Sequence, residues 1–187
     1  MKKAVFLDKD GTLIINVPYN VNPTLVQLVP DAGAALQTLK SMGFELVVIS
    51  NQAGIAKGYF SVDDIRIVFA KINELLQEYD VSISAFFFCP HLKSGTVERY
   101  SRDCHCRKPL PGLIMDAADQ LEIDLSLSWM IGDILDDVEA GNRAGCRTVL
   151  INNGNETEWV MVENRVPGFI VSHLATAAEV ISKNSIQ

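Results

Sequence analysis

The stretch Ala4-Val5-Phe6-Leu7-Asp8-Lys9-Asp10-Gly11-Thr12 decides how this chain is interpreted. Four apolar residues that run into a turn signal predict a short buried strand. Side chains at i and i+2 of an extended segment point the same way, so Asp8 and Asp10 can both reach a pocket at the strand's carboxyl end. Two carboxylates this close repel each other unless a cation or a shared proton intervenes. An ordinary strand followed by an Asp-Gly turn is the alternative that this stretch alone leaves open.

Length, composition and charge narrow the class of protein. A chain of 187 residues, 48% of them hydrophobic, suits a single domain over residues 1–187 with a sizeable core. No apolar run approaches the roughly 18 residues of a membrane span, and the N-terminus lacks the apolar region of a signal peptide. The net charge of −7 disfavours binding to nucleic acid backbones. We therefore expect a cytoplasmic, monomeric protein that binds neither membranes nor nucleic acid.

Apolar strands alternate with helical patterns along the chain. The expected strands cover residues 4–7, 44–49, 83–88, 127–131, 148–151 and about 169–171. The expected helices cover residues 31–42, 61–79 and 111–121, a short segment ending at 144, and 174–182. Asp31 is the expected cap of the first helix. This alternation predicts an α/β fold with a parallel sheet and helices on both faces.

Polar side chains follow three of the expected strands. They are Asp8 and Asp10 after the first, Ser50-Asn51-Gln52 after the second, and Asp133, Asp136 and Asp137 after the fourth. Ligands of open α/β sheets bind beyond the carboxyl ends of the strands, near the point where strand order reverses. Residues 13–30 are expected to form a loop over this edge, where Asn16 and Tyr19 could contact a ligand; an ordinary surface excursion is the alternative.

Asp8 and Asp133 together indicate a site for a hard divalent cation. Mg²⁺ prefers oxygen ligands and often lies between carboxylates and a substrate phosphate. Such an ion offsets the repulsion between a carboxylate nucleophile and a phosphate dianion, and Lys108 can add positive charge to the transferring oxygens. This combination is typical of a phosphatase. A surface role for Lys108 is the alternative.

A second metal site is expected in the loop over about residues 89–106. Cys89-x-His91 and Cys104-x-Cys106 supply three thiolates and one imidazole, which fill a tetrahedral zinc site and leave no open position. The expected zinc is therefore structural. His105 is an alternative ligand, but adjacent side chains rarely converge on one ion, and reduced cysteines without a metal are the other alternative. Cys146 lies far from this group and is expected to be a small core residue.

The motifs resemble those of the haloacid dehalogenase superfamily. The matching residues are Asp8-x-Asp10-Gly11-Thr12, Ser50-Asn51, Lys108 and Gly132-Asp133-x-x-x-Asp137, in the family's order. The resemblance implies a three-layer, Rossmann-like fold. Cys-x-His and Cys-x-Cys-Arg-Lys-Pro resemble a subgroup that holds the heptose 1,7-bisphosphate and the histidinol-phosphate phosphatases, and the stretch 50–60 is more similar to the heptose enzymes. The larger members carry a cap domain, for which this chain has no segment of sufficient length.

The resemblance also implies roles for the site residues. Asp8 would be the nucleophile, and Asp10 would protonate the leaving oxygen and then activate water. Asp8, the Asp10 backbone carbonyl and Asp133 would hold Mg²⁺, with Asp137 supporting them from behind. Ser50 and Lys108 would bind the phosphoryl group during its transfer. The expected substrate contacts are Asn16, Tyr19, Asn51, Gln52 and Arg107.

The implied activity is removal of the 7-phosphate from D-glycero-D-manno-heptose 1,7-bisphosphate, which supplies heptose for bacterial surface polysaccharide. Two departures from the family pattern stand out: Ile134 replaces a lysine after the fourth-motif aspartate, and Ser50 replaces the more usual threonine. The alternatives are a histidinol-phosphate phosphatase, a phosphatase of nucleic acid 3′ ends, which the charge disfavours, and a non-catalytic zinc-stabilised binding module. The last would lack at least one of Asp8, Asp10, Lys108 or Asp133, and all four are present.

Overall fold

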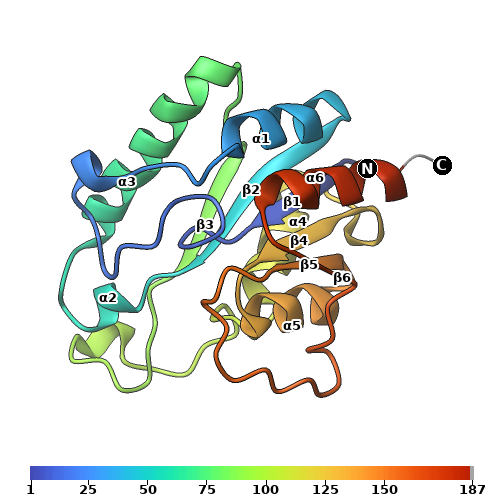
Figure 1. Ribbon diagram of the computed structural model, residues 1–187. Coiled ribbons are helices and arrows are strands. Elements are labelled where there is room, and N and C mark those ends of the chain that lie inside the picture. The colour runs from blue at the N-terminus through green and yellow to red at the C-terminus, as the bar shows by residue number, and fades with distance from the viewer. Residues whose placement is uncertain (186–187) are drawn as a thin grey trace.

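The structure, a computed structural model, describes residues 1–185 and is built around a six-stranded sheet (Figure 1). All neighbouring strands are parallel, in the order β3-β2-β1-β4-β5-β6. The strands are β1 (Lys3–Leu7), β2 (Phe44–Asn51), β3 (Ala85–Cys89), β4 (Trp129–Gly132), β5 (Arg147–Ile151) and β6 (Phe169–Val171). The α-helices are α1 (Ala32–Ser41), α2 (Ala53–Ala56), α3 (Val62–Leu76), α4 (Gly112–Leu121), α5 (Leu135–Ala144) and α6 (Leu174–Asn184).

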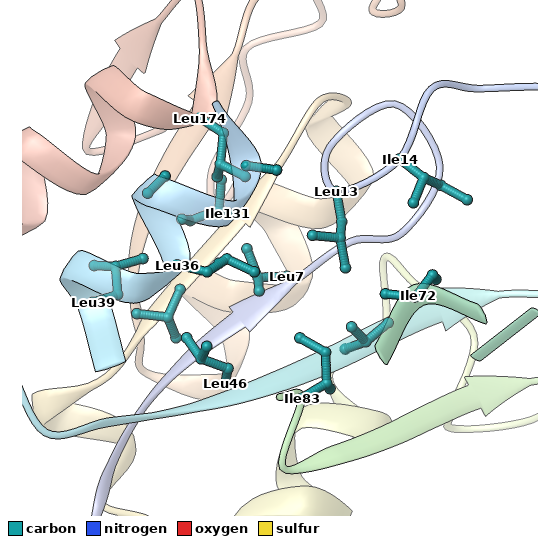
Figure 2. Packing of buried hydrophobic residues seen from close by; sticks show 14 of the residues in the cluster. Leu7, Leu13, Ile14, Leu36, Leu39, Leu46, Ile72, Ile83, Ile131 and Leu174 are labelled. Atoms are coloured by element: carbon teal, nitrogen blue, oxygen red, sulfur yellow. The ribbon is translucent and has the colours of Figure 1, made fainter. Parts of the chain in front are cut away.

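Helices cover both faces of the sheet, as the sequence predicts. Val5 and Leu7 of β1 pack with α1, α3 and α6 in one core, where Figure 2 shows Leu7 close to Leu36 and Ile131. Ala4 and Phe6 point to the opposite face and pack with α4 and α5. Because both faces are buried, the strand is a continuous apolar run rather than an alternating one. The predicted three-layer α/β architecture is confirmed.

The strand order reverses between β1 and β4. The chain passes from β1 outward through β2 and β3, then returns to the other side of β1 for β4, β5 and β6. Leu7 pairs with Ile131 in the register of β1 and β4, and the Asp8 amide donates a 2.9 Å hydrogen bond to the Ile131 carbonyl. Asp8 and Asp133, which follow these two strands, therefore flank the switch point where such sheets bind ligands.

The first residues of α3 and α1 compare differently with the sequence-based expectation. Ser61 begins α3 with a capping box, in which its hydroxyl accepts from the Asp64 amide and the Asp64 carboxylate accepts from the Ser61 amide. The predicted cap by Asp31 is wrong, because Asp31 has a left-handed backbone (φ 62°) and its side chain accepts no capping hydrogen bond. A capping side chain reaches the first turn from an extended backbone.

The loops beyond the carboxyl ends of the strands hold the remaining features. The short helix α2 is absent from the sequence-based assignment, and a single turn of 3-10 helix (Pro23–Leu25) lies in the loop after β1. In residues 1–185 no folded cap domain is inserted between the strands. No helix of that described range is long and apolar enough to cross a membrane.

Candidate active site

Lys108 lies at the centre of a buried charge cluster. Its ammonium group contacts the Asp8 carboxylate, lies 2.6 Å from Asp137 Oδ1, and donates a 2.9 Å hydrogen bond to the Ile49 carbonyl. Lys108 is 3% exposed, and Asp137 is fully buried. We call Asp8, Asp133, Asp137 and Lys108 the carboxylate cluster. The structure thus brings together the side chains that the sequence placed after β1, after β4 and before α4.

The carboxylate cluster has an excess of negative charge. Burial raises the pKa of Asp8 to about 7, an effect that Lys108 opposes and Asp137 reinforces. Burial and the Asp8 charge raise the pKa of Asp133 to about 6. Burial alone would lower the pKa of Lys108, but the facing carboxylates of Asp137 and Asp8 hold it above its usual value. Three carboxylates share one ammonium group, which is the condition that a bound cation relieves.

Asp8 and Asp133 offer the donors for such a cation. Carboxylate oxygens of Asp8, Asp133 and Asp137 can all lie within 4.8 Å of one another. Asp137 already accepts from the backbone amides of Asp133 (3.2 Å) and Ile134 (3.3 Å) and faces Lys108. Its carboxylate therefore supports the cluster from behind, while Asp8 and Asp133 remain as oxygen ligands. Such a donor set fits a hard divalent cation.

The loop after β5 contributes two contacts that the sequence analysis missed. Asn155 Nδ2 donates to Asp133 Oδ2, and Asn153 Nδ2 donates a 2.8 Å hydrogen bond to the Gly11 carbonyl. Gly11 has φ +89°, and a Cβ there would collide with the Asp133 carboxylate and with Asn155. Both asparagines follow a strand, which is the signal that points to Asp8, but the Asn153-Gly154 pair is equally typical of an ordinary turn.

Asp10 is held on both of its carboxylate oxygens. Lys9 Nζ lies 2.8 Å from Oδ1, and Gln52 Nε2 lies 3.3 Å from Oδ2. Gln52 also donates a 2.8 Å hydrogen bond to Ser50 Oγ, which connects Asp10 with the end of β2. Lys9 is only 2% exposed, although lysine is seldom buried. Its residue type gave no signal of this role.

A pocket of about 310 Å³ opens beside Asp10. It is lined by Lys9, Asp10, Asn16, Pro18, Tyr19, Asn20, Asn51, Gln52, Ala53 and Gly54. Four of the five predicted substrate contacts therefore line one pocket, and Arg107 is the exception. Asn51 has a further role, since its amide donates to the Lys108 carbonyl and accepts from the Lys108 amide, both at 3.0 Å. This pair of bonds fixes the backbone that carries the buried lysine.

The predicted zinc ligands also lie together. We call Cys89, His91, Cys104 and Cys106 the cysteine cluster. Cys89 Sγ lies 2.9 Å from Cys106 Sγ and 3.5 Å from Cys104 Sγ, and His91 Nδ1 lies 3.3 Å from Cys106 Sγ. The four possible ligand atoms all lie within 4.8 Å of one another, and three sulfurs with one imidazole nitrogen fit a closed tetrahedral zinc site. The hydrogen bond between Cys89 and Cys106 lowers the pKa of Cys106 and raises that of Cys89, so it favours the metal-binding thiolate at Cys106.

His105, the alternative zinc ligand, and Cys146, the fourth cysteine, both lie outside the cysteine cluster. The His105 side chain is 76% exposed, and its Nε2 lies 3.4 Å from Asp116 Oδ2, so His91 is the imidazole of the group. Cys146 is buried between the sheet and α4 and α5. Burial raises the pKa of the Cys146 thiol to about 12, which agrees with its predicted place in the core.

Comparisons with known proteins agree with this geometry. A HAD-hydrolase-like family model matches residues 105–177. The D-glycero-beta-D-manno-heptose-1,7-bisphosphate 7-phosphatase of Pasteurella multocida is 42% identical over 82% of this chain and 84% of its own. The enzyme of the same name from Escherichia coli K12 is 36% identical over 84% and 87% of the two chains. The crystal structure of D,D-heptose 1,7-bisphosphate phosphatase from B. bronchiseptica, complexed with magnesium and phosphate, superposes with a TM-score of 0.80 at 26% identity, covering 97% of this chain and 99% of the other.

Proposed function

Because this chain belongs to the D-glycero-β-D-manno-heptose-1,7-bisphosphate 7-phosphatase family of HAD-like hydrolases, we propose that it releases the 7-phosphate of that sugar bisphosphate. It is a phosphoric monoester hydrolase with a phosphorylated sugar as its substrate. One observation of the site carries the proposal further. Asp8 lies at the switch point of the sheet, next to a buried lysine and two residues before Asp10, which lines the pocket.

The first step transfers the phosphoryl group to Asp8. A carboxylate oxygen of Asp8 attacks phosphorus, and the bond from phosphorus to the O7 of the sugar breaks. Asp10 delivers a proton to that leaving oxygen. Its place in the lining of the pocket supports this role, since Lys9 and Gln52 hold the two oxygens of its carboxylate.

The second step frees the enzyme. Asp10, now ionised, takes a proton from water, whose oxygen attacks phosphorus, and the bond between phosphorus and Asp8 breaks to release inorganic phosphate. Ser50 and Lys108 bind the transferring oxygens in both steps. The Lys108 ammonium is fixed by Asp137, the Ile49 carbonyl and the two Asn51 bonds, so its charge is already in place when the phosphoryl group arrives.

The metal ions of the proposal are Mg²⁺ and Zn²⁺. Asp8, Asp133 and the Asp10 carbonyl would hold Mg²⁺, which neutralises charge on the phosphate and on the nucleophile. The raised pKa values of Asp8 and Asp133 support a cation there. The cysteine cluster would hold a structural Zn²⁺. Its last ligand, Cys106, directly precedes Arg107 and Lys108, so the zinc would anchor the segment that carries the catalytic lysine.

The proposed setting is a cytoplasmic, single-domain monomer. The four cysteines are free thiols rather than disulfides, as a reducing compartment favours. The carboxylate cluster and the pocket are formed by residues of one chain, which supports the proposal of a monomer. The acidic charge of −7 speaks against nucleic acid as the substrate. The sugar 1-phosphate product would serve the synthesis of bacterial surface polysaccharide.

Phosphate release tests the substrate. We expect kcat/KM for D-glycero-β-D-manno-heptose 1,7-bisphosphate to exceed that for histidinol phosphate by about 100-fold or more, the range that missing polar contacts produce. ³¹P NMR of the reaction should show loss of the 7-phosphate and retention of the anomeric phosphate. A preference for histidinol phosphate, or release of the 1-phosphate, would overturn the proposal.

A further inference from the structure

Lys57 is a cation at the rim of the pocket that the reaction leaves unexplained. It directly follows α2, and its Nζ donates a 2.6 Å hydrogen bond to the hydroxyl of Tyr19, which lines the pocket. The ammonium also lies 4.9 Å from the ring centre of Tyr19 and 5.8 Å from that of Tyr59. A hydroxyl and two aromatic rings therefore hold this exposed charge next to Tyr19.

No carboxylate forms an ion pair with Lys57 or with Arg107 anywhere in residues 1–185. The Tyr19 hydrogen bond raises the pKa of Lys57, and the positive charge of Arg107 acts weakly in the opposite direction. The Arg107 guanidinium donates only a long, 3.4 Å hydrogen bond to the His91 carbonyl. These two like charges lack a counterion.

The other two lysines of the site differ in this respect. Lys9 is paired with Asp10, and Lys108 is paired with Asp8 and Asp137. In a chain with a net charge of −7, Lys57 is thus a cation without an ion pair that is bonded to a residue of the pocket, and Arg107 is a second cation without one. Such a cation creates a local positive potential that attracts an anion. The transferring phosphate occupies Asp8 and Lys108, so the anion at the rim has to be another group.

We propose that Lys57 binds the phosphate that is not transferred, and that it thereby selects sugar bisphosphates over monophosphates. This inference rests on the proposed function, in which the substrate carries one phosphate at each end of the sugar. The inner phosphate reaches Asp8, and the outer phosphate lies against the Lys57 ammonium. Tyr19 and Tyr59 act as positioning residues that hold the lysine in place for this contact.

The test compares Lys57→Met with the wild type on two substrates that differ only in the outer phosphate. They are the heptose 1,7-bisphosphate and the heptose 7-phosphate. We expect kcat/KM for the bisphosphate to fall about 10- to 100-fold, mainly through KM, since one charge-assisted hydrogen bond is lost. The value for the monophosphate should change less than about 3-fold. Lys57→Arg keeps the charge and should restore most of the preference.

Lys71→Met is the matched control, because it removes the same charge from α3, where Lys71 pairs with Glu74. It should leave both substrates unaffected. A second readout needs no turnover: inhibition by the heptose 1-phosphate product should weaken in Lys57→Met, while inhibition by inorganic phosphate stays the same. Thermal melting of each variant establishes that it is folded, and Lys57→Gln replaces Lys57→Met if the latter is not.

Equal losses on both substrates would overturn the inference, because Lys57 would then only hold the Tyr19 loop. An unchanged product inhibition would do the same. A wild-type enzyme inactive on the bisphosphate would instead overturn the proposed function, and this inference with it. The two failures are therefore distinguishable in one set of measurements.

Discussion

The carboxylate cluster and the cysteine cluster are positioned by different parts of the molecule. Asp8 and Asp133 directly follow the adjacent strands β1 and β4, whose side chains are almost wholly buried. In the cysteine cluster only Cys89 belongs to a strand, the edge strand β3. The other three ligands lie on the loop after it, where most residues are exposed or half-buried.

The difference indicates what each metal does for the protein. The carboxylate cluster is held by the sheet, so its cation changes charge and reactivity rather than the course of the chain. The loop of the cysteine cluster has few apolar contacts of its own, so its ligands supply the cross-links that a core would otherwise provide. Loss of the first metal should therefore cost activity, and loss of the second should cost structure.

The largest expected effect is that of Asp8→Asn on turnover. Loss of the nucleophile should reduce kcat by about 10⁴-fold or more. The melting temperature without Mg²⁺ should stay the same or rise, because the raised pKa shows that the ionised Asp8 destabilises the folded state. Steady-state kinetics and thermal melting check the two parts. Substantial residual turnover would contradict the role of Asp8.

Cys104→Ser should have the opposite effect to Asp8→Asn, because it should lower stability more than turnover. With one of four ligands removed, we expect zinc content to fall well below one per chain and the melting temperature to fall by about 10 °C. Turnover should fall less than in Asp8→Asn. Cys146→Ser is the control, since this buried cysteine lies outside the cluster and its variant should retain zinc. Zinc analysis that finds no metal in the wild type would contradict the prediction.

Asn155→Ala tests a case in which both kinds of positioning act together. Asn155 lies in a loop, and it supports Asp133, a metal ligand at the end of a strand. Loss of its bond to Asp133 should weaken Mg²⁺ binding roughly 10-fold. Calorimetric titration with Mg²⁺ measures this directly. Asn152→Ala is the control on the same loop, since the Asn152 side chain is exposed. Equal Mg²⁺ affinities in the two variants would show that Asn155 only orders the loop.

The last prediction concerns the pH dependence of stability without Mg²⁺. The pKa of Asp8 is about 7 and that of Asp133 about 6 in the folded state, above the usual value of 3.8. The folded state therefore binds more protons, and stability falls as pH rises from about 4 to 7. Mg²⁺ should raise the melting temperature more at about pH 8 than at about pH 5. In Asp8→Asn the Mg²⁺ effect on the melting temperature should differ less between the two pH values. If stability without Mg²⁺ depends on pH as strongly as in the wild type, the raised pKa of Asp8 is contradicted.

The sequence was sufficient for the layers and for most of the site. Each buried strand is an apolar run that ends in polar residues, so Asp8, Ser50 and Asp133 could be placed at one edge before the strand order was known. Lys108 was found from its motif context. Its burial against Asp137, however, depends on the packing of α5 beside the segment before α4, which no local pattern reports.

Three features could not be predicted, each for a physical reason. The contact of Asn155 with Asp133 depends on β5 lying next to β4, which only the strand order reveals. Lys9 is buried because Asp10 neutralises it, whereas its residue type indicates exposure. Asp31 has the residue type of a helix cap but not the backbone angle, and a sequence reports only the former.

The acid-quenched mass of the enzyme during turnover of heptose 1,7-bisphosphate tests the central claim most directly. The account predicts a gain of one phosphoryl group on the peptide that contains Asp8. The adduct should be absent in Asp8→Asn and present in those Cys104→Ser molecules that remain folded, because the cysteine cluster takes no part in the chemistry. Turnover without an adduct on that peptide, or an adduct on another residue, would contradict the account.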